Sequence, residues 1–312
     1  MNKLSIAIIQ HKPVHLNIEK SLAKSVTLIK EAAGKGANLI VFGESWLSGY
    51  PAWIDHCPEI ALWNNETTKE VFTQMHQNSV DVQGNVMKTL CALASELKVF
   101  LCIGFNEKIT AGVGSGTIYN SFVIINDEGD IVNHHRKLIP TFNEKLLYGN
   151  GDAAGLKTTG TKWGMMGGLI CWEHWMPLSR QTLHNENEII HIALWPTVHE
   201  MHQVASRHYA FEGRCFVIAA GQMMQAKDIP SALSIPEQLK NAPEKYILNG
   251  GSCVIGPDGS YILPPQFEKE EILYCTIDDF DKVLKEKLTM DTSGHYNRWD
   301  IFDFTVNKKR KY

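Results

Sequence analysis

The sequence lacks any regular spacing of cysteines. Its seven cysteines are an odd number scattered over 312 residues, and no two of them are separated by only two residues. Disulfide-rich secreted domains and structural zinc sites both depend on paired or closely spaced cysteines. The 13 histidines likewise show no His-Glu-x-x-His pattern of a catalytic zinc site. We therefore expect a cytoplasmic protein with reduced thiols, no disulfide framework and no metal.

Long apolar runs, flexible linkers and strong net charge are also missing. No stretch approaches the roughly 20 apolar residues of a membrane-spanning helix, and we expect no signal peptide because the first apolar run is too short for its apolar region. Without a linker, repeat or low-complexity segment, we expect one domain over residues 1–312, with a C-terminal tail from about residue 285. A net charge of −4 favours neither nucleic acid nor an anionic membrane as a partner. The one basic run, residues 308–311, is typical of a solvated terminus.

Strands and helices alternate along most of the chain. An apolar run at 4–10 precedes a helical pattern that Gly34 and Gly36 end, and a second apolar run follows at 37–42. This order is typical of a βαβ unit with parallel strands. The alternation returns three times as a helix and then a strand, at 86–97 and 99–105, at 177–184 and 189–194, and at 199–213 and 215–220.

Two hairpins interrupt this alternation. Residues 127–129 (Asp-Glu-Gly) join strands predicted at 118–126 and 130–134, and residues 257–259 (Pro-Asp-Gly) join strands predicted at 252–255 and 261–263. Hairpins inserted among helix–strand units predict an α/β fold with a mixed sheet covered by helices.

Reactive side chains stand where three predicted strands end. Glu44 follows the strand at 37–42, Lys137 closes the strand after the first hairpin turn, and Cys171 ends an apolar run. Because ligands of α/β sheets bind at the carboxyl ends of strands, the three side chains are candidates for one site. Each residue also has a plainer interpretation. Glu44 fits a surface loop, Lys137 fits a solvated basic turn, and Cys171 fits a buried structural cysteine.

A carboxylate, an amine and a thiol together can perform nucleophilic catalysis. Cys171 precedes a helix that Pro177 is suited to start, and a cysteine at such a turn lies where backbone N–H groups favour its thiolate. Glu44 can take the thiol proton if burial raises its pKa. Lys137 can stabilise negative charge on the attacked substrate atom. Glu144, seven residues further on, can hold Lys137 charged or support proton transfer.

Three motifs, in order along the chain, resemble the carbon–nitrogen hydrolase (nitrilase) superfamily. They are ANLIVFGESWLSGYP with Glu44, HHRKLIPTFNEKLLYGNGD with Lys137 and Glu144, and GGLICWEHWMPLSR with Cys171. The resemblance implies an α-β-β-α sandwich in which these four residues are catalytic. The Cys-Trp-Glu-His sequence that begins at Cys171 is similar to the true nitrilase branch and to related cyanide-degrading enzymes. The amidase and carbamoylase branches usually carry an aspartate at its third position.

The resemblance also implies a reaction and a pocket. An organic nitrile becomes a carboxylic acid and ammonia through thioimidate and thioester intermediates on Cys171, with no metal or organic cofactor. Lys137 and the main-chain N–H of Trp172 are implied as stabilisers of the tetrahedral intermediates. We expect Tyr50, Trp172 and Trp195 to line the substrate pocket, because they lie in or beside the motif loops. Ordinary aromatic core packing explains each of them about as well.

Three other functions stay open. A hydratase that stops at the amide, including the cyanide-acting kind, and an amidase would use the same four residues. A catalytically silent subunit kept for binding or assembly would not need them. The presence of Glu44, Lys137, Glu144 and Cys171 together argues against the silent subunit.

Two long segments break the alternation of strands and helices. Residues 44–65 hold four aromatic residues beside two prolines and a glycine, and residues 225–249 mix three prolines with six large aliphatic residues. Loops of this length are usually functional or interfacial. Relatives in the resembled family associate through a helix face, and unpartnered apolar surface is costly. We therefore expect a homodimer or larger assembly with residues 225–249 at a subunit contact; a lid over the active site is the alternative.

Overall fold

The computed structural model describes residues 3–311, which form two β-sheets. The first sheet has the order β13-β1-β2-β3-β4-β5, and the second has the order β10-β11-β9-β8-β7-β6 with β12 paired to β11. The strands of the first sheet are β1 (Leu4–Gln10), β2 (Leu39–Phe42), β3 (Phe100–Lys108), β4 (Ile118–Ile125), β5 (Ile131–Arg136) and β13 (Glu271–Ile277). Those of the second are β6 (Thr159–Thr161), β7 (Gly164–Ile170), β8 (Glu188–Leu194), β9 (Phe216–Ala220), β10 (Met223–Gln225), β11 (Tyr246–Ile255) and β12 (Tyr261–Phe267).

The α-helices of the described residues are short to medium in length. They are α1 (Ile18–Gly34), α2 (Glu66–Gln77), α3 (Asn85–Leu97), α4 (Pro177–His184), α5 (Glu200–Gly213), α6 (Glu237–Lys240) and α7 (Asp281–Lys287). Within residues 3–311, none of these helices has both the length and the apolar content needed to cross a membrane.

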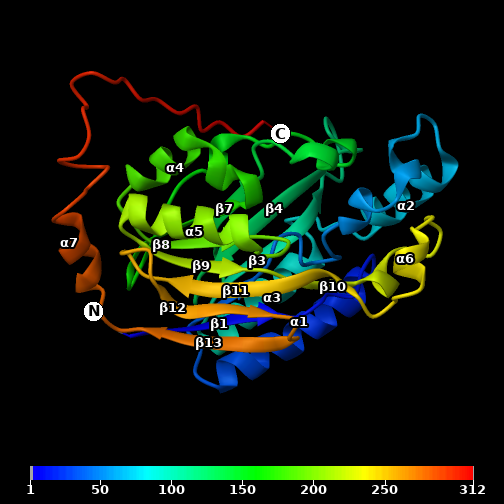
Figure 1. The fold of residues 1–312 in the computed structure, drawn as a ribbon, viewed down its shortest axis with the longest axis horizontal. Coiled ribbons are helices and arrows are strands. Elements are labelled where there is room, and N and C mark those ends of the chain that lie inside the picture. Colours follow the sequence, from blue (N-terminus) through cyan, green and yellow to red (C-terminus); the bar gives the residue numbers. More distant parts are fainter. Residues whose placement is uncertain (1–2, 312) are drawn as a thin grey trace.

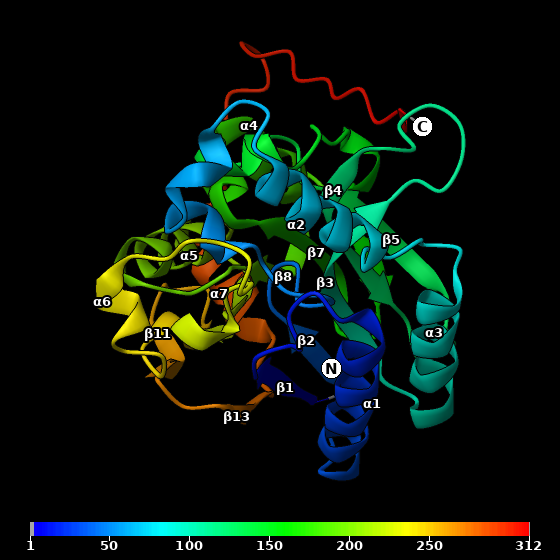
Figure 2. The ribbon, with the colours of Figure 1, turned by 90° about the vertical axis from the view of Figure 1, so that its right-hand side faces the viewer.

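The two sheets pack against each other, and helices cover their outer faces (Figure 1). Figure 2 shows α1 and α3 on one side of the sheets and α5 on the other. Side chains alternate accordingly: Ile6 and Ile8 of β1 join the core between the sheets, whereas Ala7 and Ile9 pack in the cluster under α1 and α3. The predicted α-β-β-α sandwich is thus confirmed.

Capping and turn residues set the ends of several elements, among them the helix start predicted at Pro177 and the two predicted hairpin turns. The side chain of Asn17 accepts a 3.0 Å hydrogen bond from the main-chain N–H of Lys20 at the start of α1. Pro177 is the first residue of α4. Gly129 and Gly259 have φ values of +90° and +76°, in the left-handed region that suits glycine in these two hairpin turns.

The predicted mixed character of the sheet is confirmed, but some elements are missing from the sequence prediction. Each of the two sheets is mixed: β1 is parallel to β2 and antiparallel to β13, and β7 is parallel to β8 and antiparallel to β6. β13 and α2 lie outside the predicted alternation. β13 pairs with β1, which lies at the opposite end of the chain, so no local sequence pattern predicts this strand.

The two long segments pack on each other. Trp53 and Ile60 from residues 44–65 share one apolar cluster with Leu233 and Leu239 from residues 225–249. These side chains are at most 7% exposed. These apolar side chains are therefore buried within the chain, which removes the reason for expecting residues 225–249 at a subunit contact, while the contact itself stays a prediction.

The basic run near the C-terminus is not simply solvated. Residues 288–311 contain no helix or strand and cross the top of the molecule in Figure 1. The side chain of Lys308 pairs with Glu186. The guanidinium of Arg310 lies 3.2 Å from Asp152 and donates a 2.6 Å hydrogen bond to the carbonyl oxygen of His134. Carboxylates and a strand carbonyl thus anchor the tail.

Close packing at Gly104 in β3 yields a first prediction. A Cβ built there would lie 2.4 Å from the carbonyl oxygen of Gly43 and 2.6 Å from the main-chain nitrogen of Ser45. We expect Gly104→Ala to lower the free energy of unfolding by about 1–3 kcal/mol, and to impair activity because Glu44 lies between those two residues. Urea denaturation and activity assays check this.

Gly160→Ala in β6 is the matched control, because no heavy atom lies within 4 Å of its built Cβ. Equal stability of the two variants would contradict the proposed tight fit around Glu44.

Candidate active site

The four candidate catalytic residues lie at adjoining ends of the two sheets. Glu44 is the second residue after β2 and Lys137 the first after β5, both in the first sheet, whereas Cys171 directly follows β7 in the second. Glu144 lies in the 3-10 helix η3 (Phe142–Leu146). All four side chains are at most 3% exposed. The structure therefore brings the strand ends together, but from two sheets rather than one.

Lys137 joins the two carboxylates. Its Nζ lies 2.8 Å from Oε1 of Glu44 and 2.8 Å from both carboxylate oxygens of Glu144. Burial alone would lower the pKa of Lys137, but the neighbouring Cys171, Glu144 and Glu44 raise it well above its usual value. Lys137 is thus a fixed positive charge.

One ammonium cannot fully compensate two carboxylates away from water. Burial raises the pKa of Glu44 to about 7, with Glu144 adding to the rise and Lys137 opposing it. A carboxyl group with that pKa exchanges its proton near neutral pH, which is what a general base requires.

The two oxygens of Glu44 have different surroundings. Oε1 accepts hydrogen bonds from Lys137 and, at 2.7 Å, from Nδ2 of Asn120. Oε2 is buried and has no hydrogen-bond partner among residues 3–311. The side chain of Gln222 donates to the main-chain carbonyl of Glu44. Glu44 is therefore held by one oxygen and by its backbone, which leaves Oε2 able to accept a proton.

Glu144 is held by its own helix and by Tyr50. The main-chain N–H of Thr141 donates to Oε2 of Glu144 at 2.9 Å, and the Tyr50 hydroxyl donates to Oε1 at 2.8 Å. Burial and the charge of Glu144 raise the pKa of Tyr50 well above its usual value, so Tyr50 remains a donor.

Cys171 combines a buried thiol with a strained backbone. Its φ of +51° lies in the left-handed region, which residues with a Cβ rarely adopt. Burial and the charge of Glu44 raise the pKa of Cys171 well above its usual value, and Lys137 and the main-chain N–H of Trp172 only partly oppose them. The sequence-based expectation of a favoured thiolate is wrong for this environment, and the thiol needs a base.

Glu173, which sequence reasoning did not single out, ties the two sheets together. Its carboxylate accepts main-chain hydrogen bonds from Leu138 at 2.8 Å and from Ile170 at 2.7 Å. Nε2 of His135 lies 2.9 Å from the same carboxylate. Leu138 and Ile170 are the neighbours of Lys137 and Cys171 in sequence, so Glu173 fixes the catalytic amine relative to the thiol. Only its closeness to Cys171 in the sequence pointed to it.

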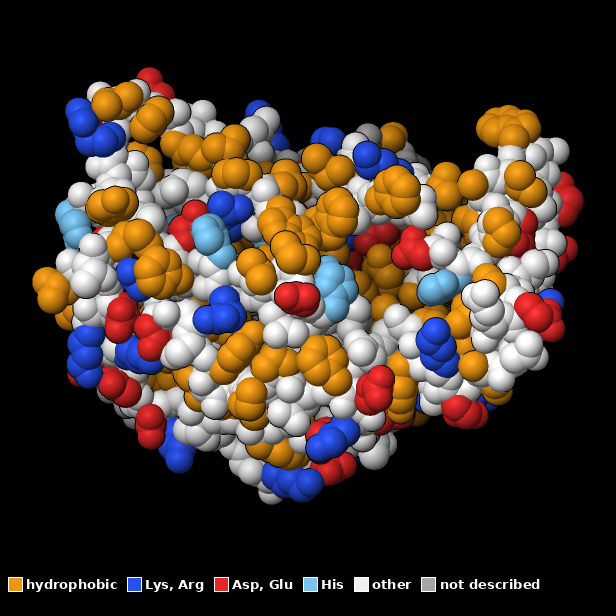
Figure 3. Space-filling view, in the orientation of Figure 1, with side chains coloured by type: hydrophobic (Ala, Val, Ile, Leu, Met, Phe, Trp, Pro, Cys, Tyr) orange, Lys and Arg blue, Asp and Glu red, His pale blue; other side chains and the backbone are white. Residues whose placement is uncertain are grey.

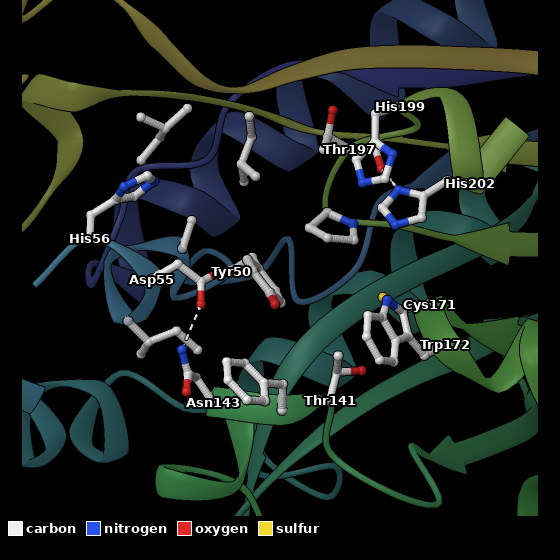
Figure 4. Close-up of a pocket in the computed structure, with 16 residues that line it drawn as sticks. Tyr50, Asp55, His56, Thr141, Asn143, Cys171, Trp172, Thr197, His199 and His202 are labelled. Carbon is white, nitrogen blue, oxygen red and sulfur yellow. Dashed lines mark hydrogen bonds between the residues drawn. The ribbon is translucent and has the colours of Figure 1, made fainter. Parts of the chain in front are cut away.

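A cavity of about 320 Å³ opens at Cys171. In Figure 3 the surface is hollowed to the right of centre, between the N-terminal end of α5 and the segment that precedes α2. Figure 4 shows Cys171 and Trp172 at one end of the cavity and Asp55 and His56 at the other. Apolar side chains of both long segments contribute to its wall: Ala52, Ile54, Ile247 and Leu248.

Of the three residues predicted to line the pocket, two lie at the cavity and one does not. Tyr50 and Trp172 line the cavity. Trp195 is fully buried and packs elsewhere, with its ring stacked on His174 and His202 at centroid distances of 4.6 and 4.3 Å. Core packing, the plainer interpretation, therefore describes Trp195.

Metal ligation is not suggested by the arrangement of side chains. Within residues 3–311, no three His, Cys, Asp or Glu side chains are grouped so that they could hold a metal ion.

A buried thiol beside a carboxyl group and an amine, at the edge of an α-β-β-α sandwich, is an arrangement that can support nucleophilic catalysis by cysteine. Residues 5–281 match the family model described as carbon-nitrogen hydrolase. The chain belongs to this family.

Known proteins resemble the chain over nearly its whole length. An aliphatic nitrilase from Sinorhizobium fredii is 33% identical over 313 residues, covering 100% of this chain and 98% of that protein. A nitrilase from Pseudomonas syringae pv. syringae is 34% identical over 325 residues, covering 97% and 90%. The crystal structure of a carbon-nitrogen hydrolase from Helicobacter pylori, 21% identical, superposes with a TM-score of 0.72 over 96% of this chain and 97% of that one, which supports the fold.

The buried charges yield a second prediction. Lys137→Met leaves Glu44 and Glu144 without a counter-charge, and loss of the ammonium raises the pKa of Glu44 further in the folded state. A carboxyl group with a raised folded-state pKa loses its stabilising contribution as the pH rises. We expect a loss of about 3 kcal/mol in unfolding free energy at pH 8 and a smaller loss at pH 5, measured by urea denaturation.

Lys145→Met is the matched control, because Lys145 is an exposed lysine of the same 3-10 helix as Glu144. A loss for Lys137→Met that is equal at both pH values would indicate packing rather than charge.

Proposed function

We propose that the protein is a nitrilase, which hydrolyses an organic nitrile to a carboxylic acid and ammonia. The observation that carries the proposal is the ion-paired cluster of Glu44, Lys137 and Glu144 beside the Cys171 thiol at the end of a cavity. Two relatives of nearly the same length carry the names aliphatic nitrilase and nitrilase.

The reaction begins with transfer of the thiol proton to Glu44. The sulfur of Cys171 then attacks the nitrile carbon, and Glu44 passes the thiol proton to the nitrile nitrogen, which gives a thioimidate. Water adds to the thioimidate carbon while Glu44 takes one of its protons and passes it to the nitrogen. The second proton of this water moves to the nitrogen as the C–N bond breaks, so that ammonia leaves and a thioester remains. A second water cleaves the thioester to release the acid and restore the thiol.

Lys137 and a main-chain N–H support the charged intermediates. The ammonium of Lys137 is held by two carboxylates and cannot reorient, so it stabilises negative charge at no cost of reorganisation. The main-chain N–H of Trp172 interacts with the sulfur of Cys171 and is close enough to stabilise charge that develops on the attacked group.

A panel of aliphatic, aromatic and arylacetic nitriles tests the activity. Ammonia release with formation of the carboxylic acid is the expected result. Release of the amide instead would favour the hydratase alternative, in which the tetrahedral intermediate loses the thiolate rather than ammonia. Turnover of amides with no turnover of any nitrile would contradict the proposal and favour an amidase.

The role of the nucleophile is a third prediction. Cys171→Ala should reduce ammonia release below about one-thousandth of the wild-type rate while the protein stays folded, because the bond to substrate cannot form. Cys91→Ser is the matched control at a cysteine in α3, and it should retain activity. Substantial activity of pure, folded Cys171→Ala protein would contradict the assignment.

The pKa of Glu44 yields a fourth prediction. Glu44 accepts the thiol proton only when it is ionised, and its pKa is about 7. We therefore expect kcat/KM to fall by about tenfold per pH unit below pH 7. A profile that is flat down to pH 5 would show that the base is another group.

We also propose that the protein assembles as a homodimer or larger oligomer through the α4 and α5 face. Large apolar side chains are exposed on these helices, namely Leu178, Met201, Val204 and Phe211. Figure 3 shows hydrophobic side chains gathered on the face that carries them. Such surfaces are typical of protein contacts. Light scattering should give at least twice the chain mass, and a fully active monomer would contradict the proposal.

The cytoplasm is the proposed compartment, because the reaction needs a reduced thiol. All seven cysteines are unpaired, and reducing conditions keep them so. Fractionation of the cells that produce the protein tests the location, and recovery in an oxidising compartment would contradict it.

A further inference from the structure

A chain of hydrogen bonds that the reaction does not use runs from the main chain of Cys171 towards β8 and α5. The carbonyl oxygen of Cys171 lies 2.7 Å from Nδ1 of His174, and Nε2 of His174 lies 3.0 Å from Nε2 of His191. Nδ1 of His191 lies 2.8 Å from Oε1 of Glu188. The hydroxyl of Tyr209 donates a 2.6 Å hydrogen bond to Oε2 of Glu188.

The carbonyl at one end sets the direction of every proton in this chain. A carbonyl oxygen only accepts, so His174 donates from Nδ1. In neutral His174 the other nitrogen then accepts, and His191 must donate to it from its own Nε2. Nδ1 of His191 is left as an acceptor. Glu188 can donate to that nitrogen only as the neutral acid.

An imidazolium with an ionised Glu188 would use the same number of protons, but it separates charge in the core. His174, His191 and Glu188 are each at most 2% exposed, and buried charges are costly. Burial raises the pKa of Glu188 to about 8 and lowers that of His191 well below its usual value. The neutral arrangement is therefore favoured.

Stacking holds both imidazole rings in this orientation. His191 stacks on Tyr209 with ring centroids 3.7 Å apart and an interplanar angle of 26°. His174 stacks on Trp195 at 4.6 Å and 24°. Turning either ring by 180° would keep its stacking but would place carbon atoms where the nitrogens now lie, so the hydrogen bonds of the chain would be lost.

We propose that neutral Glu188, acting through His191 and His174, holds the carbonyl of Cys171 and thereby keeps the nucleophile in its left-handed backbone conformation. The three residues are positioning residues, because the cavity lining in the described part of the chain includes none of them. The proposal rests on Cys171 as the nucleophile of the proposed function, and it does not depend on which substrate is hydrolysed.

Two variants of Glu188 test the proposal. In Glu188→Gln the amide nitrogen donates to His191 and the amide oxygen accepts from Tyr209, so the chain stays complete. Glu188→Leu removes both contacts. Glu186→Gln is the matched control, because Glu186 lies two residues earlier and bonds instead to Thr158 and Lys308.

Two measurements distinguish a change in the position of Cys171 from a loss of folding and from the use of a poor substrate. One is kcat and KM on a nitrile that the wild-type protein hydrolyses. The other is the rate of alkylation of Cys171 by iodoacetamide, followed by mass spectrometry on tryptic peptide 163–180, which contains no other cysteine. Alkylation reports on the thiol even if no nitrile is turned over.

We expect Glu188→Gln and Glu186→Gln to match the wild type within about twofold, and Glu188→Leu to lose about tenfold or more in kcat and in alkylation rate with KM little changed. Equal losses in Glu188→Gln and Glu188→Leu would overturn the proposal, since Glu188 would then act as an anion. Wild-type rates in Glu188→Leu would overturn it too.

If Glu188→Leu does not fold, nitrogen NMR of the histidines in the wild-type protein tests the proposal instead. His174 protonated only at Nδ1 and His191 only at Nε2 would support the ordered chain, and a doubly protonated His191 would refute it.

Discussion

Two buried carboxyl groups share one buried ammonium, and the rest of the site depends on this constraint. Burial raises the pKa of Glu44 to about 7, because Lys137 opposes that rise only in part and Glu144 adds to it. Burial likewise raises the pKa of the Cys171 thiol. In the proposed mechanism the thiol therefore becomes a nucleophile by transferring its proton to Glu44 when the substrate is attacked, and it is not already ionised in the resting protein.

The fold supplies this arrangement by joining two sheets at their strand ends. Glu173 bonds to the main chain next to Lys137 and next to Cys171, so the first and second sheets cannot shift relative to each other without breaking it. The left-handed backbone at Cys171 is unfavourable by itself and needs support from the surrounding structure. Glu173 and the His174 chain both bond to the main chain within one residue of the sulfur.

The sequence predicts where the strands end. It does not predict features of the site that depend on contacts between distant segments. Glu44 and Cys171 follow apolar runs whose ends are visible locally, and the family motifs supply their partners. Asn120 lies within β4, and nothing in the strand pattern distinguishes a residue that bonds to Glu44. Trp195 follows a predicted strand just as Cys171 does, yet its ring turns into the core. The pKa of Cys171 was equally inaccessible, because the burial that raises it comes from both sheets.

The central claim is that Cys171 forms a covalent intermediate with the substrate carbon. Acid quenching during turnover of a nitrile, followed by tryptic digestion and mass spectrometry, tests it most directly. The account predicts a substrate-derived acyl or imidoyl mass increase on peptide 163–180, which contains Cys171, and no such increase on peptides with the other six cysteines. Continued ammonia release with no adduct on that peptide, or an adduct on another cysteine, would contradict the account.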